Sequence, residues 1–257
     1  MSPRVALVTG AAGGIGAAVV DLLAARGHVV VAADLRFPDR PTSPGSAPHA
    51  TATSPSGPAA TPGQVVPVRL DVTDESAVVR LVRWVEDEVG PLEVLVNAAG
   101  VLHAGVVTES SLADWQRMLA VNATGVYLVS REVARCLSSR RRGAIVTVAS
   151  NAAGVPRVGM AAYAASKGGV AAMTLPLARD LADLRIRVMT IAPGIFSTPM
   201  MASLPAEAQE SLAAQVPHPR RLGRPEEFAR LVCAIVENPM LNGEVIRLDG
   251  GIRMAPR

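Results

Sequence analysis

Short hydrophobic runs recur along the chain between segments with helical periodicity. The runs are rich in Val, Ile and Ala, and they predict strands at 5–9, 28–33, 65–70, 94–97, 144–149, 187–192 and 244–248. Strands that alternate with helices predict a parallel sheet, because a parallel crossover usually contains a helix. The unbroken apolar run at 29–33 is typical of a strand buried on both faces. The sequence therefore predicts an α/β fold in which a doubly wound parallel sheet has helices on both faces.

One segment, residues 36–63, interrupts this rhythm. It consists largely of Pro, Ser, Thr, Ala and Gly, and its repeated prolines exclude a regular helix. We expect a mobile surface loop there in place of a crossover helix, without a catalytic role. At 257 residues the chain fits one large domain better than two, so we expect a single domain over 1–257.

Composition and charge exclude several classes of protein. The net charge of +3 does not by itself indicate nucleic acid, and the densest basic run, Arg140 to Arg142, is interpreted as a solvated helix end or loop. Two cysteines are too few and too far apart to suggest a disulfide framework or a metal site. The chain shows neither a leader nor a long charge-free apolar run. We therefore expect a cytoplasmic protein with no membrane or nucleic-acid partner.

A glycine cluster from Thr9 to Gly16 follows the first predicted strand and precedes an amphipathic run at 17–26. Glycines at such a turn let the backbone approach a pyrophosphate at a helix N-terminus, although tight turns also need glycine. Asp34 ends the second strand, where a carboxylate can accept hydrogen bonds from both ribose hydroxyls and would repel a 2′-phosphate. The pattern favours NAD over NADP, with Arg36 as a residue that could partly accommodate that phosphate.

Two more polar segments follow predicted strands. Asp71 and Val72 end the third strand, and the segment from Asn97 to Gly100 ends the fourth. Ligands of open α/β sheets bind beyond the carboxyl ends of the strands, so we expect adenine and ribose contacts there. Asp71 could instead cap a helix, in competition with Thr73 or Asp74.

Lys167 is the only lysine of the chain, and it follows Tyr163, one of two tyrosines, by four residues. Residues four apart share a helix face, so both side chains can point into one cleft. A guanidinium cannot imitate a compact ammonium that can lose a proton. The ammonium would lower the pKa of the phenol from about 10, which would make it a proton donor and acceptor near neutral pH. A YxxxK match is weak evidence when it stands alone.

Several motifs occur in order across almost the whole chain: TGxxxGxG at 9–16, NAAG at 97–100, Asn122, Ser150, YxxxK at 163–167 and Pro193-Gly194. Together they resemble the short-chain dehydrogenase/reductase family. The resemblance implies a Rossmann-like fold and an NAD(P)-dependent oxidoreductase acting on CH–OH groups. No cluster of metal ligands offers an alternative chemistry.

The resemblance implies a catalytic tetrad of Asn122, Ser150, Tyr163 and Lys167. Tyr163 would pass the proton and Ser150 would hydrogen-bond the reacting oxygen. Lys167 would tune Tyr163 and hold the nicotinamide ribose, and Asn122 would position a water. The implied NAD contacts are Gly10, Gly14, Ile15, Gly16, Asp34, Asp71, Val72, Asn97, Ala98, Gly100, Tyr163, Lys167, Pro193, Gly194 and Thr198.

For the substrate, the chain is similar to two groups within the family. Residues 92–166 resemble the 2,3-dihydro-2,3-dihydroxybenzoate dehydrogenases of siderophore biosynthesis, and residues 167–257 resemble the 3-hydroxyacyl-CoA dehydrogenases of type 2. We prefer the ring diol, whose oxidised product would tautomerise to a catechol, and keep the acyl-CoA as the alternative. Candidate substrate contacts are His103, Ser150, Arg157, which could pair with a carboxylate, and Met200. The segment 197–216 is apolar enough for a lid, or for helix packing.

A hypothesis of another class is an NAD-binding interaction subunit in which turnover is incidental, since fold does not fix function. The complete tetrad argues against it. Residues 243–257 resemble the C-terminal strand and tail of the family, which often pack against a neighbouring subunit. This resemblance implies a homotetramer.

Overall fold

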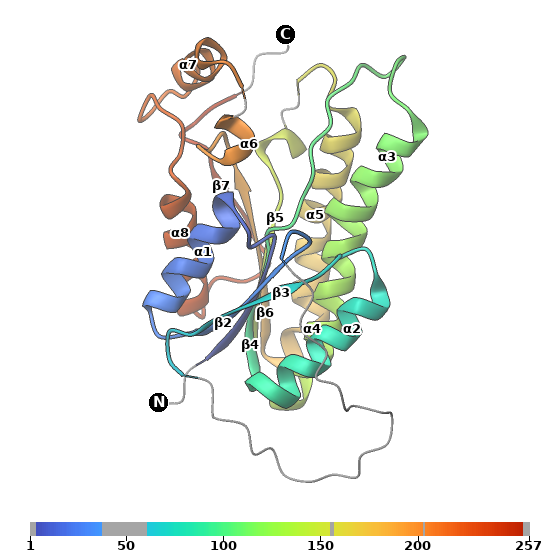
Figure 1. Cartoon of the computed structure of the whole chain (residues 1–257), viewed down its shortest axis with the longest axis vertical. Coiled ribbons are helices and arrows are strands. Elements are labelled where there is room, and N and C mark those ends of the chain that lie inside the picture. Colours follow the sequence, from blue (N-terminus) through green and yellow to red (C-terminus); the bar gives the residue numbers. More distant parts are fainter. Residues whose placement is uncertain (1–3, 38–60, 155–156, 203, 254–257) are drawn as a thin grey trace.

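The computed structural model describes residues 4–37, 61–154, 157–202 and 204–253. Their strands form one parallel sheet in the order β3-β2-β1-β4-β5-β6-β7 (Figure 1). The strands are β1 Val5–Thr9, β2 Val29–Asp34, β3 Val65–Arg69, β4 Leu92–Asn97, β5 Gly143–Val148, β6 Ile186–Pro193 and β7 Val245–Leu248. Each predicted strand is confirmed, with ends that differ by at most two residues.

Helices cover both faces of this sheet (Figure 1). One face carries α1 (Gly14–Ala25) and α8 (Pro225–Glu237), and the other carries α2 (Glu75–Trp84), α4 (Val126–Arg140) and α5 (Ala161–Asp180). Shorter helices are α3 (Leu112–Leu119), α6 (Pro199–Ala202) and α7 (Ala206–Ala214). The doubly wound, Rossmann-like α/β fold is therefore confirmed. Within the described ranges, no helix has the length and apolar character needed to span a membrane.

The core consists of two apolar layers, one on each face of the sheet. On β1, Val5 and Leu7 pack into the layer beneath α2, α4 and α5, whereas Ala6 and Val8 pack into the layer beneath α1 and α8. Successive side chains of a strand point to opposite faces, so a strand covered on both sides is apolar at every position. This explains the unbroken hydrophobic runs and why they predicted the central strands so well.

Local signals in the sequence set the ends of the helices. Asp74 caps α2 by accepting a hydrogen bond from the backbone N–H of Ala77 at 3.0 Å, which decides the competition for this role in favour of Asp74. The Asp71 carboxylate instead accepts from the backbone N–H of Thr73 at 2.9 Å and from its hydroxyl at 2.7 Å. Helix α4 ends at Arg140, which confirms the interpretation of the basic run as a helix end. Most of the predicted mobile loop, residues 38–60, lies outside the described residues.

Candidate active site

The loop between β1 and α1 is packed backbone against backbone. A Cβ at Gly10 would lie 2.6 Å from Ala99 N, and a Cβ at Gly16 would lie 2.1 Å from Gly10 O. Real side-chain carbons do not approach this closely, so glycine is required at both positions. The following helix α1 has no side-chain hydrogen bond at its N-cap, Gly13. Its first backbone N–H groups therefore have no acceptor from the N-cap side chain, as suits an anion-binding loop.

Asp34, the last residue of β2, faces this loop. Its carboxylate accepts hydrogen bonds from the backbone N–H of Ala12 at 3.0 Å and from Arg36, through the backbone N–H at 2.9 Å and Nε at 3.1 Å. Burial would raise the pKa of Asp34, but the hydrogen bonds from Arg36 and Ala12 outweigh it and lower the pKa below its usual range. Asp34 is therefore an ionised carboxylate held beside the glycine loop.

The segment after β4 connects the glycine loop to the interior of the site. The backbone N–H of Ala98 donates to Thr9 O at 3.2 Å, while the buried Asn97 side chain turns to Ser130 of α4, at 2.9 Å. Asn97 thus binds Ser130 through its side chain, while the backbone of the segment contacts the glycine loop. A Cβ at Gly100 would lie 3.4 Å from Lys167 Nζ, so Gly100 borders the candidate catalytic residues.

Asn122 is fully buried in a π-helical turn, Ala120–Gly125, that joins α3 to α4. Its Oδ1 accepts from the backbone N–H of Val101 at 2.8 Å, and its Nδ2 donates to Val101 O at 2.9 Å. The same Nδ2 lies 3.1 Å from Ser166 Oγ, which itself donates to Tyr163 O at 2.8 Å. Asn122 therefore links the segment after β4 to the first turns of α5.

Lys167 points from α5 to the end of β5, where Nζ donates to the carbonyl oxygen of Val148 at 2.7 Å. The side chain is buried, with a residue exposure of 4%. Burial disfavours the charged form and lowers the pKa of Lys167 to about 8. An amine with this pKa can hold or release a proton close to physiological pH.

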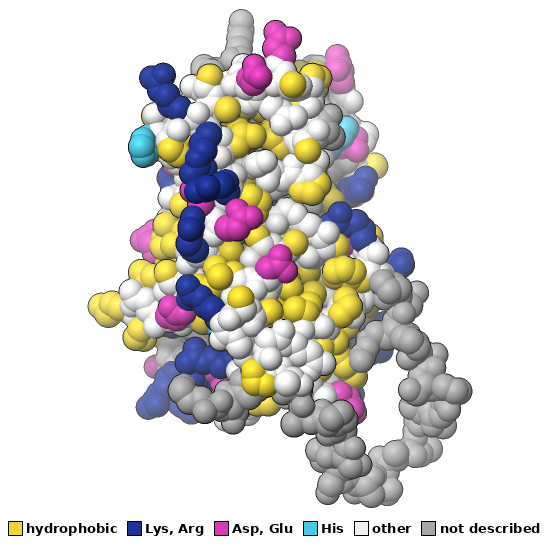
Figure 2. Space-filling model, turned by 60° about the vertical axis from the view of Figure 1, so that its left-hand side comes forward, with side chains coloured by type: hydrophobic (Ala, Val, Ile, Leu, Met, Phe, Trp, Pro, Cys, Tyr) yellow, Lys and Arg dark blue, Asp and Glu magenta, His cyan; other side chains and the backbone are white. Residues whose placement is uncertain are grey.

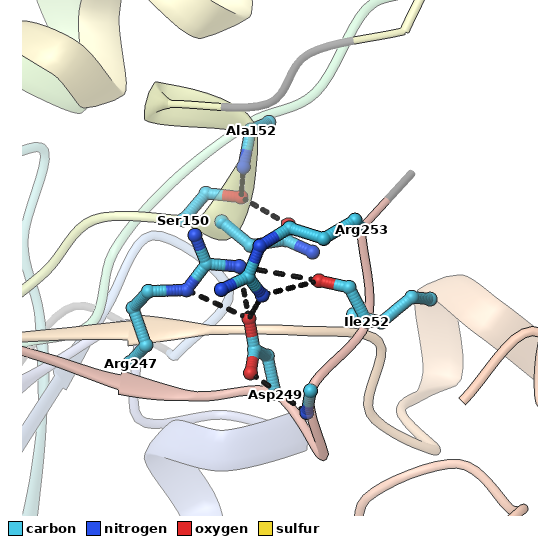
Figure 3. Close-up of polar contacts among 8 residues, drawn as sticks. Ser150, Ala152, Arg247, Asp249, Ile252 and Arg253 are labelled. Atoms are coloured by element: carbon cyan, nitrogen blue, oxygen red, sulfur yellow. Dashed lines mark hydrogen bonds and ion pairs between the residues drawn. The ribbon is translucent and has the colours of Figure 1, made fainter. Parts of the chain in front are cut away.

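Ser150 and Tyr163 meet at the carboxyl end of β5. Ser150 Oγ accepts from the backbone N–H of Ala152 at 3.1 Å (Figure 3). Burial raises the pKa of Tyr163, and a hydrogen bond with Ser150 opposes this rise without cancelling it. The prediction that Lys167 lowers the pKa of Tyr163 is therefore wrong for this structure. The reason is that the phenol is itself buried, while the ammonium donates to a carbonyl of β5.

The segment after β6 runs from the end of the sheet that carries the candidate catalytic residues to the glycine loop. Gly194 N donates to Leu248 O at 2.9 Å, and a Cβ at Gly194 would lie 2.7 Å from Asp249 Cβ, so the ends of β6 and β7 touch here. Asp249 binds Arg247 Nε at 2.9 Å and lies 3.6 Å from Arg253 (Figure 3). Farther along, Thr198 Cγ2 lies 3.3 Å from the Cβ position of Gly14.

The candidate substrate contacts lie on surrounding loops. His103 is exposed, and its Nε2 lies 3.8 Å from Asp114 Oδ2 of α3. Arg157 is half-buried, and the backbone bond from Gly105 N to Gly159 O, 2.9 Å, joins its loop to that of His103. Among the described contacts, neither His103 nor Arg157 hydrogen-bonds to Ser150 or Tyr163.

The possible lid, residues 197–216, folds into α6 and α7. Leu204 is 39% exposed, whereas Val216 is buried at 4%. Met200 lies in α6, but its side chain is outside the described part of the chain. The segment therefore combines packed positions with an exposed apolar one, and both interpretations, lid and packing, stay open.

A cavity of about 540 Å³ opens between α1 and α8, on the face that comes forward in Figure 2. It contains none of the four candidate catalytic residues, and it touches the candidate site only through Gly14 and the segment after β6. Its lining consists of Gly14, Ala17, Ala18, Asp21, Leu22, Ala25, Ser197, Pro199, Pro225, Glu226 and Arg230.

Two contributors to the site were not foreseen from the sequence: Ser166 bridges Asn122 and Tyr163, and the Val148 carbonyl receives Lys167. Arg36 was expected as a possible partner of a 2′-phosphate, but its ion pair with Asp34 was not. Ser166 had a signal, since it is a small polar residue next to Lys167 on a helix whose other neighbours are mostly Ala and Gly. The carbonyl had none, because a backbone acceptor has no mark in the sequence.

The family model for short chain dehydrogenases matches residues 4–209. The chain therefore belongs to this family, as the motifs predicted, and it is an NAD(P)-dependent oxidoreductase that acts on CH–OH groups.

The chain is similar to three known proteins of stated activity. The chain is 44% identical to the 3-hydroxyacyl-CoA dehydrogenase type-2 of Homo sapiens, over 98% of this chain and 96% of that one. It is 36% identical to the 2,3-dihydro-2,3-dihydroxybenzoate dehydrogenase of Bacillus subtilis, over 91% and 88%. The crystal structure of 3-hydroxyacyl-CoA dehydrogenase type-2 from Mycobacterium avium superposes with a TM-score of 0.84 at 32% identity, covering 100% and 98%. Nothing in these matches supports the predicted role in siderophore biosynthesis.

The residues around the glycine loop fit a dinucleotide. Close backbone packing at Gly10 and Gly16 fixes the loop in front of the N-terminus of α1, and an ionised carboxylate, Asp34, lies beside it. Backbone N–H groups suit a pyrophosphate, and a carboxylate at the end of β2 suits a ribose diol.

Proposed function

We propose that this chain oxidises a secondary alcohol with NAD as its cofactor. The observation that carries the proposal is the convergence of Asn122, Ser150, Tyr163 and Lys167 around the ends of β4 and β5, next to a glycine loop. When bound, NAD would supply the hydride acceptor. The residues that would hold it are Gly10, Gly14, Ile15, Gly16, Asp34, Asp71, Val72, Asn97, Ala98, Gly100, Tyr163, Lys167, Pro193, Gly194 and Thr198.

In the proposed reaction, Tyr163 is the group that takes the proton from the alcohol. Its hydrogen-bonded neighbour Ser150 orients the alcohol oxygen and stabilises the phenolate. Lys167, which has a pKa of about 8, is largely cationic at neutral pH and adds a positive charge to this part of the site. Because burial raises the pKa of Tyr163, its phenolate forms at higher pH than that of a free tyrosine. We therefore expect oxidation to accelerate toward alkaline pH and reduction to be favoured at lower pH.

For the substrate, we propose a 3-hydroxyacyl-CoA first and a carboxylated ring diol second. The greater overall identity to the type-2 enzyme, 44% against 36%, supports this order, which is the reverse of the order favoured by the sequence alone. The observation that supports the second candidate is Arg157, a half-buried guanidinium on a loop tied by Gly159 to the loop of His103. A guanidinium there could hold a ring carboxylate.

The test is the initial rate of NADH formation by the purified protein with NAD and either a short 3-hydroxyacyl-CoA or 2,3-dihydro-2,3-dihydroxybenzoate. We expect a higher kcat/KM for the thioester. Preference for the diol would reverse the order of substrates. If Arg157 holds the ring carboxylate, Arg157→Gln would then lower kcat/KM for the diol and leave that for the thioester unchanged. Turnover of neither substrate would move the search to other secondary alcohols.

We also infer that residues 1–257 form one domain and that the protein is a homotetramer. The shared sheet between both core layers supports the first inference. The resemblance of residues 243–257 to a subunit-packing tail supports the second. Light scattering of the purified protein measures the mass directly, and a monomeric mass would contradict the tetramer.

A further inference from the structure

The Arg36 side chain folds back over the carboxylate of Asp34. Its Nε lies 3.1 Å from Oδ1 and its Nη2 lies 3.5 Å from Oδ2, so the two groups form an ion pair. The Arg36 side chain is 63% exposed, whereas that of Asp34 is 9% exposed. Arg36 therefore forms the outer, solvent-facing half of the pair, and Asp34 the inner half.

The guanidinium also reaches the glycine loop. Its Nη2 lies 3.3 Å from the position that a Cβ at Gly13 would occupy. The pair thus spans the space between the end of β2 and the loop, where the adenosine ribose of a dinucleotide is held in this fold. A nucleotide that enters this space meets a guanidinium as well as a carboxylate.

The ion pair leaves the Asp34 carboxylate with few free acceptor positions for a ribose. A carboxylate offers about four lone-pair directions. Three are used at short distances, by the N–H groups of Ala12 and Arg36 and by Arg36 Nε. Two ribose hydroxyls need two acceptors, so the diol can bind Asp34 fully only if the Arg36 side chain moves away.

The charge of Arg36 makes the site more favourable for a 2′-phosphate. A lone carboxylate repels a 2′-phosphate, but an ion pair has no net charge and presents guanidinium donors on its exposed side. A planar guanidinium matches the geometry of phosphate oxygens and can bind two of them at once. Arg36 therefore opposes the discrimination that Asp34 alone would impose.

We propose that Arg36 sets the nucleotide selectivity of this site, by competing with the ribose diol for Asp34 and by offering a partner to a 2′-phosphate. The proposal rests on the proposed function, because it assumes that the adenosine half of a dinucleotide binds at Asp34. The chain then accepts 2′-phosphorylated nucleotides in spite of its acidic residue at the end of β2.

The test compares two nucleotides that differ only by the 2′-phosphate, 5′-AMP and 2′,5′-ADP, by calorimetric titration at fixed ionic strength. Wild-type protein should bind both. Arg36→Gln should weaken 2′,5′-ADP by about ten- to a hundredfold, since a charge-assisted interaction is lost. The same change should leave 5′-AMP unchanged or bind it more tightly, because the Asp34 acceptors become free. Arg36→Lys should restore part of the affinity for 2′,5′-ADP.

Arg26→Gln is the matched control, since Arg26 is also an arginine paired with an acid, Glu237, but lies at the far end of α1. It removes the same charge and should shift both affinities equally and slightly. Equal weakening of both nucleotides by Arg36→Gln would mean that Arg36 only supports the local fold, and would overturn the proposal. Failure of wild type to bind 2′,5′-ADP while it binds 5′-AMP would also overturn it. Failure to bind 5′-AMP at all would instead contradict the proposed dinucleotide site.

Discussion

The glycine loop and the catalytic cluster lie at the same edge of the sheet but are built in opposite ways. The loop is made of backbone, and its shape depends on the absence of side chains at Gly10 and Gly16. The cluster is made of side chains that reach across from the π-helical turn, β5 and α5. A change in the loop should therefore damage the fold, whereas a change in the cluster should remove the chemistry and leave the fold intact.

The largest effect should come from Tyr163→Phe in the cluster. The change removes one oxygen atom and the proton-transfer group, so kcat should fall roughly 10²- to 10⁴-fold, the usual contribution of general acid–base catalysis. Affinity for 5′-AMP and the free energy of unfolding should stay close to wild type. Steady-state rates, calorimetry and urea unfolding measure the three quantities.

Tyr127→Phe is the matched control, because Tyr127 is the other tyrosine and lies exposed on α4. It should leave kcat unchanged. If Tyr163→Phe kept wild-type turnover, Tyr163 would not be the proton-transfer group. If it lost turnover but kept a cellular role, the interaction-subunit hypothesis would gain support over the enzyme.

A smaller effect, and one on stability, should come from the loop. Gly16→Ala places a Cβ 2.1 Å from Gly10 O, inside a backbone-to-backbone contact. We expect a loss of about 3 kcal/mol or more in the free energy of unfolding, as for other strained or overpacked sites. Weaker binding of 5′-AMP should accompany the loss. Urea unfolding and calorimetric titration would measure both.

Gly168→Ala provides the contrast within the catalytic helix. Gly168 also lies in a helix, and nothing lies within 4 Å of its Cβ position. The higher helix propensity of alanine should raise stability by up to about 1 kcal/mol. Similar losses at both positions would show that the two regions do not differ in the way proposed here.

The smallest expected change in stability concerns Lys167, where one substitution should raise the stability of the fold and remove the activity. Lys167 has a pKa of about 8 in the folded chain, below the value of 10.5 for a free lysine. The unfolded chain therefore binds the extra proton between these values, and wild-type stability should rise with pH across that window. Burying the ammonium at pH 7 costs about 3 kcal/mol, and the hydrogen bond to Val148 recovers part of this cost.

Lys167→Met should consequently be about 1 kcal/mol more stable than wild type at pH 7 and inactive. Its advantage should shrink as pH rises from 8 toward 10.5, because only wild type gains stability there. Urea unfolding at pH 7 and pH 9.5 would test this. A variant less stable than wild type at pH 7 would mean that the bond to Val148 outweighs the burial of the charge.

The two regions also differ in how far the sequence predicts them. The glycine loop and the strands could be predicted from the sequence, because both depend on local patterns: glycines at a tight turn and continuous apolar runs in buried strands. The polar residues Ser150 and Tyr163 were recognised as a set, and the structure brings them together. The direction of the pKa shift of Tyr163 was wrong, since it depends on burial by residues distant in sequence, which spacing within a helix does not reveal. The ion pair of Arg36 with Asp34 was not predicted for a similar reason, because the sequence does not specify side-chain rotamers.

Asn122 uses both ends of one amide group to join the chain after β4 to the start of α5. The loop beyond Val101, which carries His103 and is tied to Gly159, therefore shares a mechanical linkage with the helix that holds Tyr163 and Lys167. The loop and the helix are thus joined at two places, through the buried Asn122 side chain and through the backbone bond from Gly105 to Gly159. The loop that carries His103 and the helix that positions Tyr163 for proton transfer therefore form one connected unit.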